Sequence, residues 1–223
     1  MSGLDPTTEA VENYLKAIHR LAGESAAGEA GMKAIGNMVG VATGTATAMV
    51  KRLAAAKLAK YERFGGVRLT AKGERAAVDI LRRHRLIETF LVETLKLDWS
   101  VVHAEAERLE HAVSPLVLEA LDAHLGRPRT DPHGDPIPGA NGTLRETGGE
   151  PLASATAGAR VRVLRIADQD PAFLTFAARH GLRPDARIAV LAIDSQAESM
   201  LVQAHGSPSV SIAFAAAAKV IVE

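Results

Sequence analysis

Apolar residues recur at helical spacing through the first half of the chain, and the period changes near its end. The helical spacing predicts helices over residues 5–21, 32–39, 44–56, 73–97, 101–114 and 115–125. Asp5 and Pro6 suit the N-cap and the first position of the first of these helices. Strand patterns occupy residues 159–168, 186–194, 199–204 and 219–223, with a short helix near 173–179. The fold class is therefore mainly α with a small β part, a barrel-like domain at the C-terminus.

The segment 32–72 has the pattern of a winged helix. A tight turn at Gly40–Thr43 separates the helices 32–39 and 44–56, which is the spacing of a helix-turn-helix motif. Residues 60–64 and 67–70 flank Gly65-Gly66, and such a pair favours a two-residue hairpin turn because both glycines accept positive φ. A hairpin after a helix-turn-helix motif is the wing, so residues 1–72 are predicted to form a DNA-binding domain.

Charge is segregated along the chain although the net charge is zero. Residues 33–85 hold 12 Lys and Arg against 3 Asp and Glu, whereas residues 86–150 hold 5 against 12. This order indicates a polyanion-binding part followed by a cation-binding part. Aromatic residues make up only 4% of the chain, which favours duplex DNA over RNA as the polyanion because few rings are available for base stacking.

Small and basic residues on the second helix of the motif and on the wing are the predicted DNA contacts. Small side chains suit close approach to the major groove and contact with thymine methyl groups, and basic ones suit phosphates. The predicted DNA-contacting residues are Thr43, Thr45, Thr47, Ala48, Lys51, Arg52, Lys60, Arg63 and Arg68. No Arg, Asn or Gln lies early in the helix 44–56, so we expect specificity to depend on DNA shape and half-site spacing.

The stretch 101–114 carries the candidate metal ligands. On a helix His103, Glu107, Glu110 and His111 fall within about 100° of one another, beside an apolar stripe. Clustering carboxylates and imidazoles beside a buried seam is unfavourable without a cation, and a divalent metal is the simplest one. His84 and Glu88 repeat the i, i+4 spacing of His103 and Glu107, so neighbouring helices offer ligands for two metal sites.

The remaining features set the domain plan. The chain has no Cys, no signal-peptide pattern and no apolar run near 18 residues, so we expect a cytoplasmic protein without a membrane segment, disulfide or thiolate ligand. The helices after residue 73 have more apolar surface than a small wing covers, which predicts a homodimer. The predicted parts are a DNA-binding domain at 1–72, a helical metal-binding and dimerisation domain at 73–140, a linker at 141–158 and a β domain at 159–223.

Several motifs, in this order, resemble the diphtheria toxin repressor family of iron- and manganese-dependent transcriptional regulators. They are TTEAVENYLKAIHRL, the winged helix, RRHRLIETFL, HAEAERLEHAVS and GDPIPG, and they cover roughly residues 6–140. The last 65 residues are similar, more loosely, to the SH3-like domain of some members. The resemblance implies a primary metal site at Asn13, Glu107, Glu110 and His111, and an ancillary site at His84, Glu88 and His103. It leaves open whether Asp168 or Asp170 closes the ancillary site.

Departures from the family pattern bear on the metal. Iron-responsive members have Met and Cys where this chain has Asn13 and Glu107, and manganese-responsive members have Glu at the latter position. Ligands that are all nitrogen or oxygen suit Mn(II), although Fe(II) also binds such sites. Lys16 stands where a binuclear manganese site uses Glu, so two separate ions per subunit are expected.

The resulting hypothesis is a manganese-dependent repressor of metal-uptake genes, not an enzyme. Metal would tie the first helix to the stretch 101–114, so that a homodimer matches a palindromic operator in double-stranded DNA. An Fe(II)-dependent regulator of the same family is the nearest alternative. A metallohydrolase would need a nucleophile or base beyond the ligands and leaves the basic winged helix unexplained. A winged-helix regulator with a purely structural cluster is a further alternative.

Overall fold

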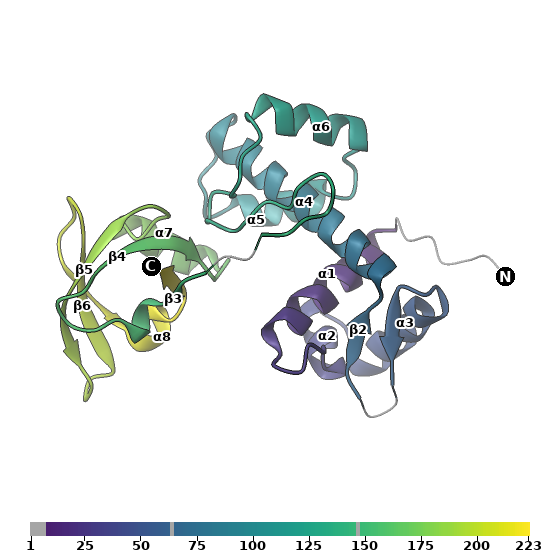
Figure 1. Ribbon diagram of the computed structural model, residues 1–223, viewed down its shortest axis with the longest axis horizontal. Helices are drawn as coiled ribbons and strands as arrows, with labels where there is room; N and C mark the ends of the chain where they lie inside the picture. Colours follow the sequence, from purple (N-terminus) through teal and green to yellow (C-terminus); the bar gives the residue numbers. More distant parts are fainter. Residues whose placement is uncertain (1–7, 63–64, 146–147) are drawn as a thin grey trace. The chain divides into compact units, whose positions relative to one another are not determined.

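The computed structural model describes residues 8–62, 65–145 and 148–223, which form two compact units (Figure 1). The first unit comprises Met1–His84, Leu109–Ser114 and Pro138–Leu144, and the second comprises the remaining segments. The predicted positions Asp5, Pro6 and Arg63 lie outside the described residues. In the part of the chain that is described, no helix has the length and apolar character needed to span a membrane.

The first unit contains the winged helix. Its elements are α1 (Glu9–Glu24), α2 (Met32–Val39), α3 (Thr43–Ala55), β1 (Ala59–Tyr61), β2 (Val67–Leu69) and the first part of α4 (Ala71–Glu93). The apolar faces of α1, α2 and α3 share one core that includes Leu15, Ile35 and Val50. Gly40 ends α2 at φ +73°, the left-handed conformation that the tight turn requires and that glycine adopts without strain.

Two details of the predicted winged helix were wrong. Val67 pairs with Tyr61, whereas a two-residue turn at Gly65-Gly66 requires it to pair with residue 64, so the expected register is wrong; residues 63 and 64 themselves lie outside the described residues. Thr43 is the first residue of α3, and Ala42 occupies the N-cap position. The order helix, turn, helix and hairpin is confirmed.

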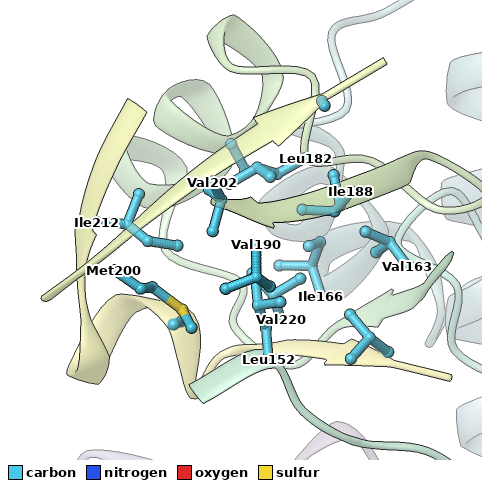
Figure 2. Close-up of a cluster of buried hydrophobic side chains, with 14 of the residues drawn as sticks. Leu152, Val163, Ile166, Leu182, Ile188, Val190, Met200, Val202, Ile212 and Val220 are labelled. Atoms are coloured by element: carbon cyan, nitrogen blue, oxygen red, sulfur yellow. The ribbon is translucent and has the colours of Figure 1, made fainter. Parts of the chain in front are cut away.

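The second unit contains the later part of α4, α5 (Val102–Leu109) up to Arg108, α6 (Pro115–His124) and a six-stranded sheet. The sheet order is β3-β8-β4-β5-β6-β7, and all neighbouring strands are antiparallel. The strands of the sheet and the other elements of the second unit are β3 (Glu150–Pro151), η1 (Leu152–Ser154, a 3-10 helix), β4 (Arg160–Ile166), α7 (Pro171–Arg179), β5 (Arg187–Asp194), β6 (Ser199–Ala204), β7 (Val210–Ala213), α8 (Phe214–Ala217) and β8 (Val220–Val222). Figure 2 shows side chains of these strands, including Val163, Val190 and Val202, meeting in one apolar cluster.

Three predicted boundaries in the later part of the chain were wrong. The helix expected over 101–114 ends at Leu109, and a hydrogen bond from Ala112 N to Leu109 O begins the turn that follows. Pro115 is the first residue of α6, and it restricts only the backbone of Ser114, so it marks the start of the next helix and not the end of α5. The helix expected over 73–97 ends at Glu93. The expected linker contributes β3 and η1 to the β domain, and Leu152 is fully buried in its core.

Candidate metal centre

Glu110 belongs to the first unit and is fully buried, and both of its carboxylate oxygens have partners. Oε1 accepts a hydrogen bond from Lys16 Nζ at 2.6 Å, and Oε2 lies 2.5 Å from His84 Nδ1. Burial alone would raise the pKa of Glu110, but the hydrogen bond from His84 and the charges of His84 and Lys16 hold it below its ordinary value. Glu110 is therefore ionised at neutral pH within a buried site.

His111 lies beside Glu110 with one ring nitrogen fixed. Its Nδ1 is 2.5 Å from Oε2 of Glu12, and the other oxygen of Glu12, Oε1, accepts a hydrogen bond from Arg83. Its Nε2 lies 3.6 Å from Glu110 Oε1 and, among the described residues, has no hydrogen-bond partner. Metal-binding histidines commonly donate a hydrogen bond through the second ring nitrogen, which orients the other lone pair. Glu12 supplies this contact, and the sequence interpretation had left it without a role.

Asn13 offers a second buried oxygen in the same unit. Its Oδ1 has no hydrogen-bond partner within the described part of the chain. Buried polar atoms are nearly always paired with protein, water or an ion. Asn13 Oδ1 and His111 Nε2 are thus unpartnered oxygen and nitrogen atoms of the kinds that a divalent cation accepts as ligands. Three of the four residues predicted for the primary site thus lie in one unit.

The second unit holds the other predicted ligands. His103 Nδ1 lies 3.1 Å from Glu88 Oε1, and His103 Nε2 lies 3.7 Å from Glu107 Oε1. Glu88 is buried, whereas His103 and Glu107 are half-buried. The predicted partner His84 precedes Glu88 by one turn of α4 and belongs to the first unit, where it contacts Glu110.

Asp131 and His133 form a group with Glu88 that the sequence interpretation missed. One ligand atom of each residue lies within 4.8 Å of those of the other two, and all three side chains are buried. His133 Nε2 lies 2.9 Å from the Trp99 carbonyl oxygen, which accepts its hydrogen, and its ring stacks on the Trp99 indole. His133 Nδ1 lies 3.6 Å from Glu88 Oε2 and has no hydrogen-bond partner among residues the structure describes. The signal that could have identified the pair is Asp-x-His in a glycine-containing loop.

Burial and the neighbouring charges shift the pKa values of Asp131 and His133. Burial raises the pKa of Asp131 to about 7, and the charges of Glu88 and Asp135 add to the effect. Burial lowers the pKa of His133, but its contact with Glu88 and the charges of Glu88 and Asp131 raise it by more. A bound cation would stabilise the ionised carboxylates that burial disfavours.

The loop that carries these residues is held against the β domain. Ile166 N donates a hydrogen bond to His133 O at 2.9 Å. Gly134 has φ +90°, and a Cβ atom at this position would lie 2.1 Å from Leu164 O. Only glycine satisfies both the backbone conformation and the close approach to β4.

Asp168 and Asp170 both have partners within the β domain. Asp170 caps α7 by accepting a hydrogen bond from Phe173 N at 2.8 Å. Asp168 accepts a hydrogen bond from Asp170 N at 2.9 Å and forms an ion pair with Lys219. Burial raises the pKa of Asp168, but the hydrogen bond from Lys219 contributes to a net decrease. The N-cap contact thus gives Asp170 a structural role, and the ion pair with Lys219 gives Asp168 one as well.

The predicted DNA-reading face is exposed on α3. The exposed residues are Thr43, Thr45, Ala48, Lys51 and Arg52, and Thr47 is half-buried. Ala46, Val50 and Leu53 are buried on the opposite side of the helix. On the wing, Arg68 is exposed and forms hydrogen bonds to Glu29 and to the Ala27 carbonyl. Lys60 on β1 is exposed.

These features define a winged-helix DNA-binding protein with buried carboxylate–imidazole groups suited to metal. The N-terminal DNA-binding domain of iron-dependent repressors matches residues 6–67, and their metal-binding and dimerisation domain matches residues 70–139. The FeoA domain, an SH3-like fold, matches residues 150–223.

Solved and curated proteins agree with this assignment. A manganese-dependent transcriptional repressor solved in complex with manganese is 39% identical, with a TM-score of 0.87 over 95% of this chain and 98% of that chain. The transcriptional regulator MntR of Escherichia coli O157:H7 is 36% identical over 113 residues, which is 51% of this chain and 71% of that protein. The iron-dependent repressor IdeR of Mycobacterium leprae is 42% identical over 103 residues, 46% of this chain and 43% of that protein. The match thus spans less than half the length of this curated relative.

The chain belongs to the iron-dependent repressor family, the metal-dependent transcriptional regulators that include the diphtheria toxin repressor.

Proposed function

We propose that this protein is a manganese-activated repressor that binds a palindromic operator as a homodimer. The observation that carries the proposal is the buried centre of the first unit, where Glu110 and the His111 Nε2 lone pair lie together without a sulfur ligand. Bound manganese would supply a divalent positive charge to this set of nitrogen and oxygen atoms. Asn13, on α1 of the same unit, is a further ligand that we propose for the primary site.

The route from this centre to DNA follows the packing of the first unit. Asn13 lies on α1, whereas Glu110 and His111 follow α5, so a shared ligand set would tie these two segments together. The buried face of α1 shares one core with α2 and α3. Fixing α1 would therefore fix the orientation of the reading face of α3. A few kcal/mol of differential affinity is enough to shift such an equilibrium.

A second ion is proposed at Glu88 in the second unit. His103 faces Glu88 Oε1, and His133 faces Glu88 Oε2, with Asp131 nearby. An oxygen of Asp168, in the same unit, is a further ligand that we propose for this centre. The Trp99 carbonyl holds the His133 tautomer in which Nδ1 carries the lone pair, as expected for a ligand. Manganese bound per subunit should fall from two to one in His133→Ala.

Apolar residues on α6 support the proposed homodimer. Leu116 is 82% exposed and Val117 is 48% exposed, and these neighbouring side chains form an apolar surface that a second copy would cover. Light scattering should show a dimer for the wild type and a monomer for Leu116→Asp. A Leu116→Asp variant that remains dimeric would contradict this interface.

DNA binding with and without metal tests the proposal as a whole. A random duplex library is enriched on the protein in Mn(II), and the enriched duplex is then used in fluorescence anisotropy with Mn(II) or EDTA. We expect tight binding only in Mn(II), loss of the response in Glu110→Gln, and a normal response in Glu24→Gln, an exposed change on α1. Equal affinity in Mn(II) and EDTA would show that the protein is not a metal switch.

The Fe(II)-responsive alternative is tested at Glu107. Replacing this carboxylate with a softer thiolate should shift metal preference from Mn(II) toward Fe(II) in Glu107→Cys. The measurement is the concentration of each ion that gives half-maximal DNA binding under anaerobic conditions. An unchanged ratio would show that Glu107 does not select the metal.

A further inference from the structure

Lys16 places an ammonium group at the centre where the proposed metal would bind. It lies on α1, one turn after Glu12, and its Nζ is 2.6 Å from Glu110 Oε1. The Glu110 side chain is fully buried, and the Lys16 side chain is 19% exposed. A buried carboxylate requires a countercharge, and Lys16 supplies one.

The atom that Lys16 contacts is also the one that a metal would need. Glu110 Oε2 is engaged by His84, whereas Oε1 lies 3.6 Å from the Nε2 atom of His111. The other ring nitrogen of His111 is held by Glu12, so its Nε2 lone pair is the donor for an ion. An ion shared by Glu110 and His111 would use Oε1 and would meet the Lys16 ammonium there.

We propose that Lys16 is the resident cation of the metal-free centre and competes with the metal for Glu110 Oε1. Lys16 would thereby set the metal concentration at which the protein responds. The inference rests on the proposed function, since it takes Glu110 and His111 to be metal ligands. Two physical effects act in the same direction: the ion pair stabilises the metal-free state, and positive charge beside the ion destabilises the bound state.

A purely structural role for Lys16 makes a different prediction. If the ion pair only held α1 to Glu110, then Lys16→Met would lower stability with and without metal and would not tighten metal binding. If Lys16 competes with the ion, Lys16→Met lowers the melting temperature in EDTA, and Mn(II) restores it. The two roles are thus separated by the sign of the change in metal affinity.

The test is a titration of full-length protein with Mn(II), with free ion measured by electron paramagnetic resonance. Lys16→Met should bind the first-unit ion about tenfold or more tightly than the wild type. Lys16→Arg, which keeps the charge, should stay close to the wild type. Lys72→Met makes the same charge change at an exposed position in the first turn of α4 and should leave the affinity unchanged.

Each remaining outcome bears on one proposal. Equal or weaker affinity in Lys16→Met overturns the competition between Lys16 and metal. If Glu110→Gln instead takes up as much Mn(II) as the wild type, the proposed primary site is overturned. If Lys16→Met folds only with metal, its rate of Mn(II) loss to EDTA is compared with the wild type. Slower loss supports competition, and equal or faster loss contradicts it.

Discussion

Asp131→Asn should stabilise the metal-free protein, and the gain should grow with pH. Asp131 is buried and its pKa is raised from 3.8 to about 7, so ionising it costs more in the folded than in the unfolded protein. The stability of the wild type is thus greatest below the unfolded pKa and falls as pH rises toward 7. Asn keeps the acceptor that Oδ1 provides to His133 N and Asp135 N, while it removes the charge.

The magnitude follows from the shift in pKa. Each pKa unit is worth about 1.4 kcal/mol, so the shift of roughly three units gives an upper bound of about 4 kcal/mol at pH 8. Losing the contact between Asp131 and Arg85, which lie 3.6 Å apart, reduces this gain. We expect about 2 to 4 kcal/mol at pH 8 and less than about 1 kcal/mol at pH 4.

Urea unfolding in EDTA at several pH values, followed by circular dichroism, measures the difference. Asp98→Asn is a control of opposite sign, because hydrogen bonds from Ser100 lower the pKa of Asp98. That variant should be destabilised at neutral pH, and the loss should disappear in acid. A pH-independent difference between Asp131→Asn and wild type would refute the reasoning. With Mn(II) present the order should reverse, since the substitution removes a ligand from the proposed second site.

Three further predictions concern stability and DNA binding. Leu152→Ala should lower the free energy of unfolding by about 2 to 5 kcal/mol because Leu152 is fully buried, whereas Leu191→Ala, at a half-exposed site, should change it little in the same urea titration. Gly134→Ala should lower the free energy of unfolding by about 2 kcal/mol or more, because a Cβ atom there would meet Leu164 O. Gly142 has a similar φ, but no described atom lies within 4 Å of a Cβ placed there, so Gly142→Ala should lower the melting temperature less in calorimetry. Lys51→Ala should weaken binding to all duplexes alike and reduce the salt-dependence slope by about one, and a change confined to one sequence would contradict a phosphate contact.

The winged helix was predictable because its signals are local. The apolar spacing of each helix, the turn at Gly40 and the paired strands all lie within short windows of sequence. The length of the wing connection was not predictable from Gly65-Gly66, since the register depends on which residues pair across the strands. The strand β7 and the helix α8 were missed because the chain changes from strand to helix without a connecting turn within residues 210–217.

The candidate metal ligands on helices were predictable from the sequence, whereas those in a loop were not. Glu88, His103 and Glu107 were found because helical spacing places ligands on one face. Asp131 and His133 come from a loop without a period, and their proximity to Glu88 depends on how that loop packs on β4. The end of α5 at Leu109 was also missed, because Val113 continues the apolar pattern beyond the last residue of the helix.

Glu88 joins two imidazoles through one carboxylate, since Oε1 faces His103 and Oε2 faces His133. A gain of positive charge on either side draws electron density from the shared group and changes how strongly the other side attracts a cation. By thermodynamic reciprocity, the influence of His103 on His133 equals that of His133 on His103. His133 is also bonded through its carbonyl to β4 of the FeoA domain. A cation bound at Glu88 would therefore be expected to hold this loop more firmly on β4, and a loosened loop would be expected to weaken cation binding.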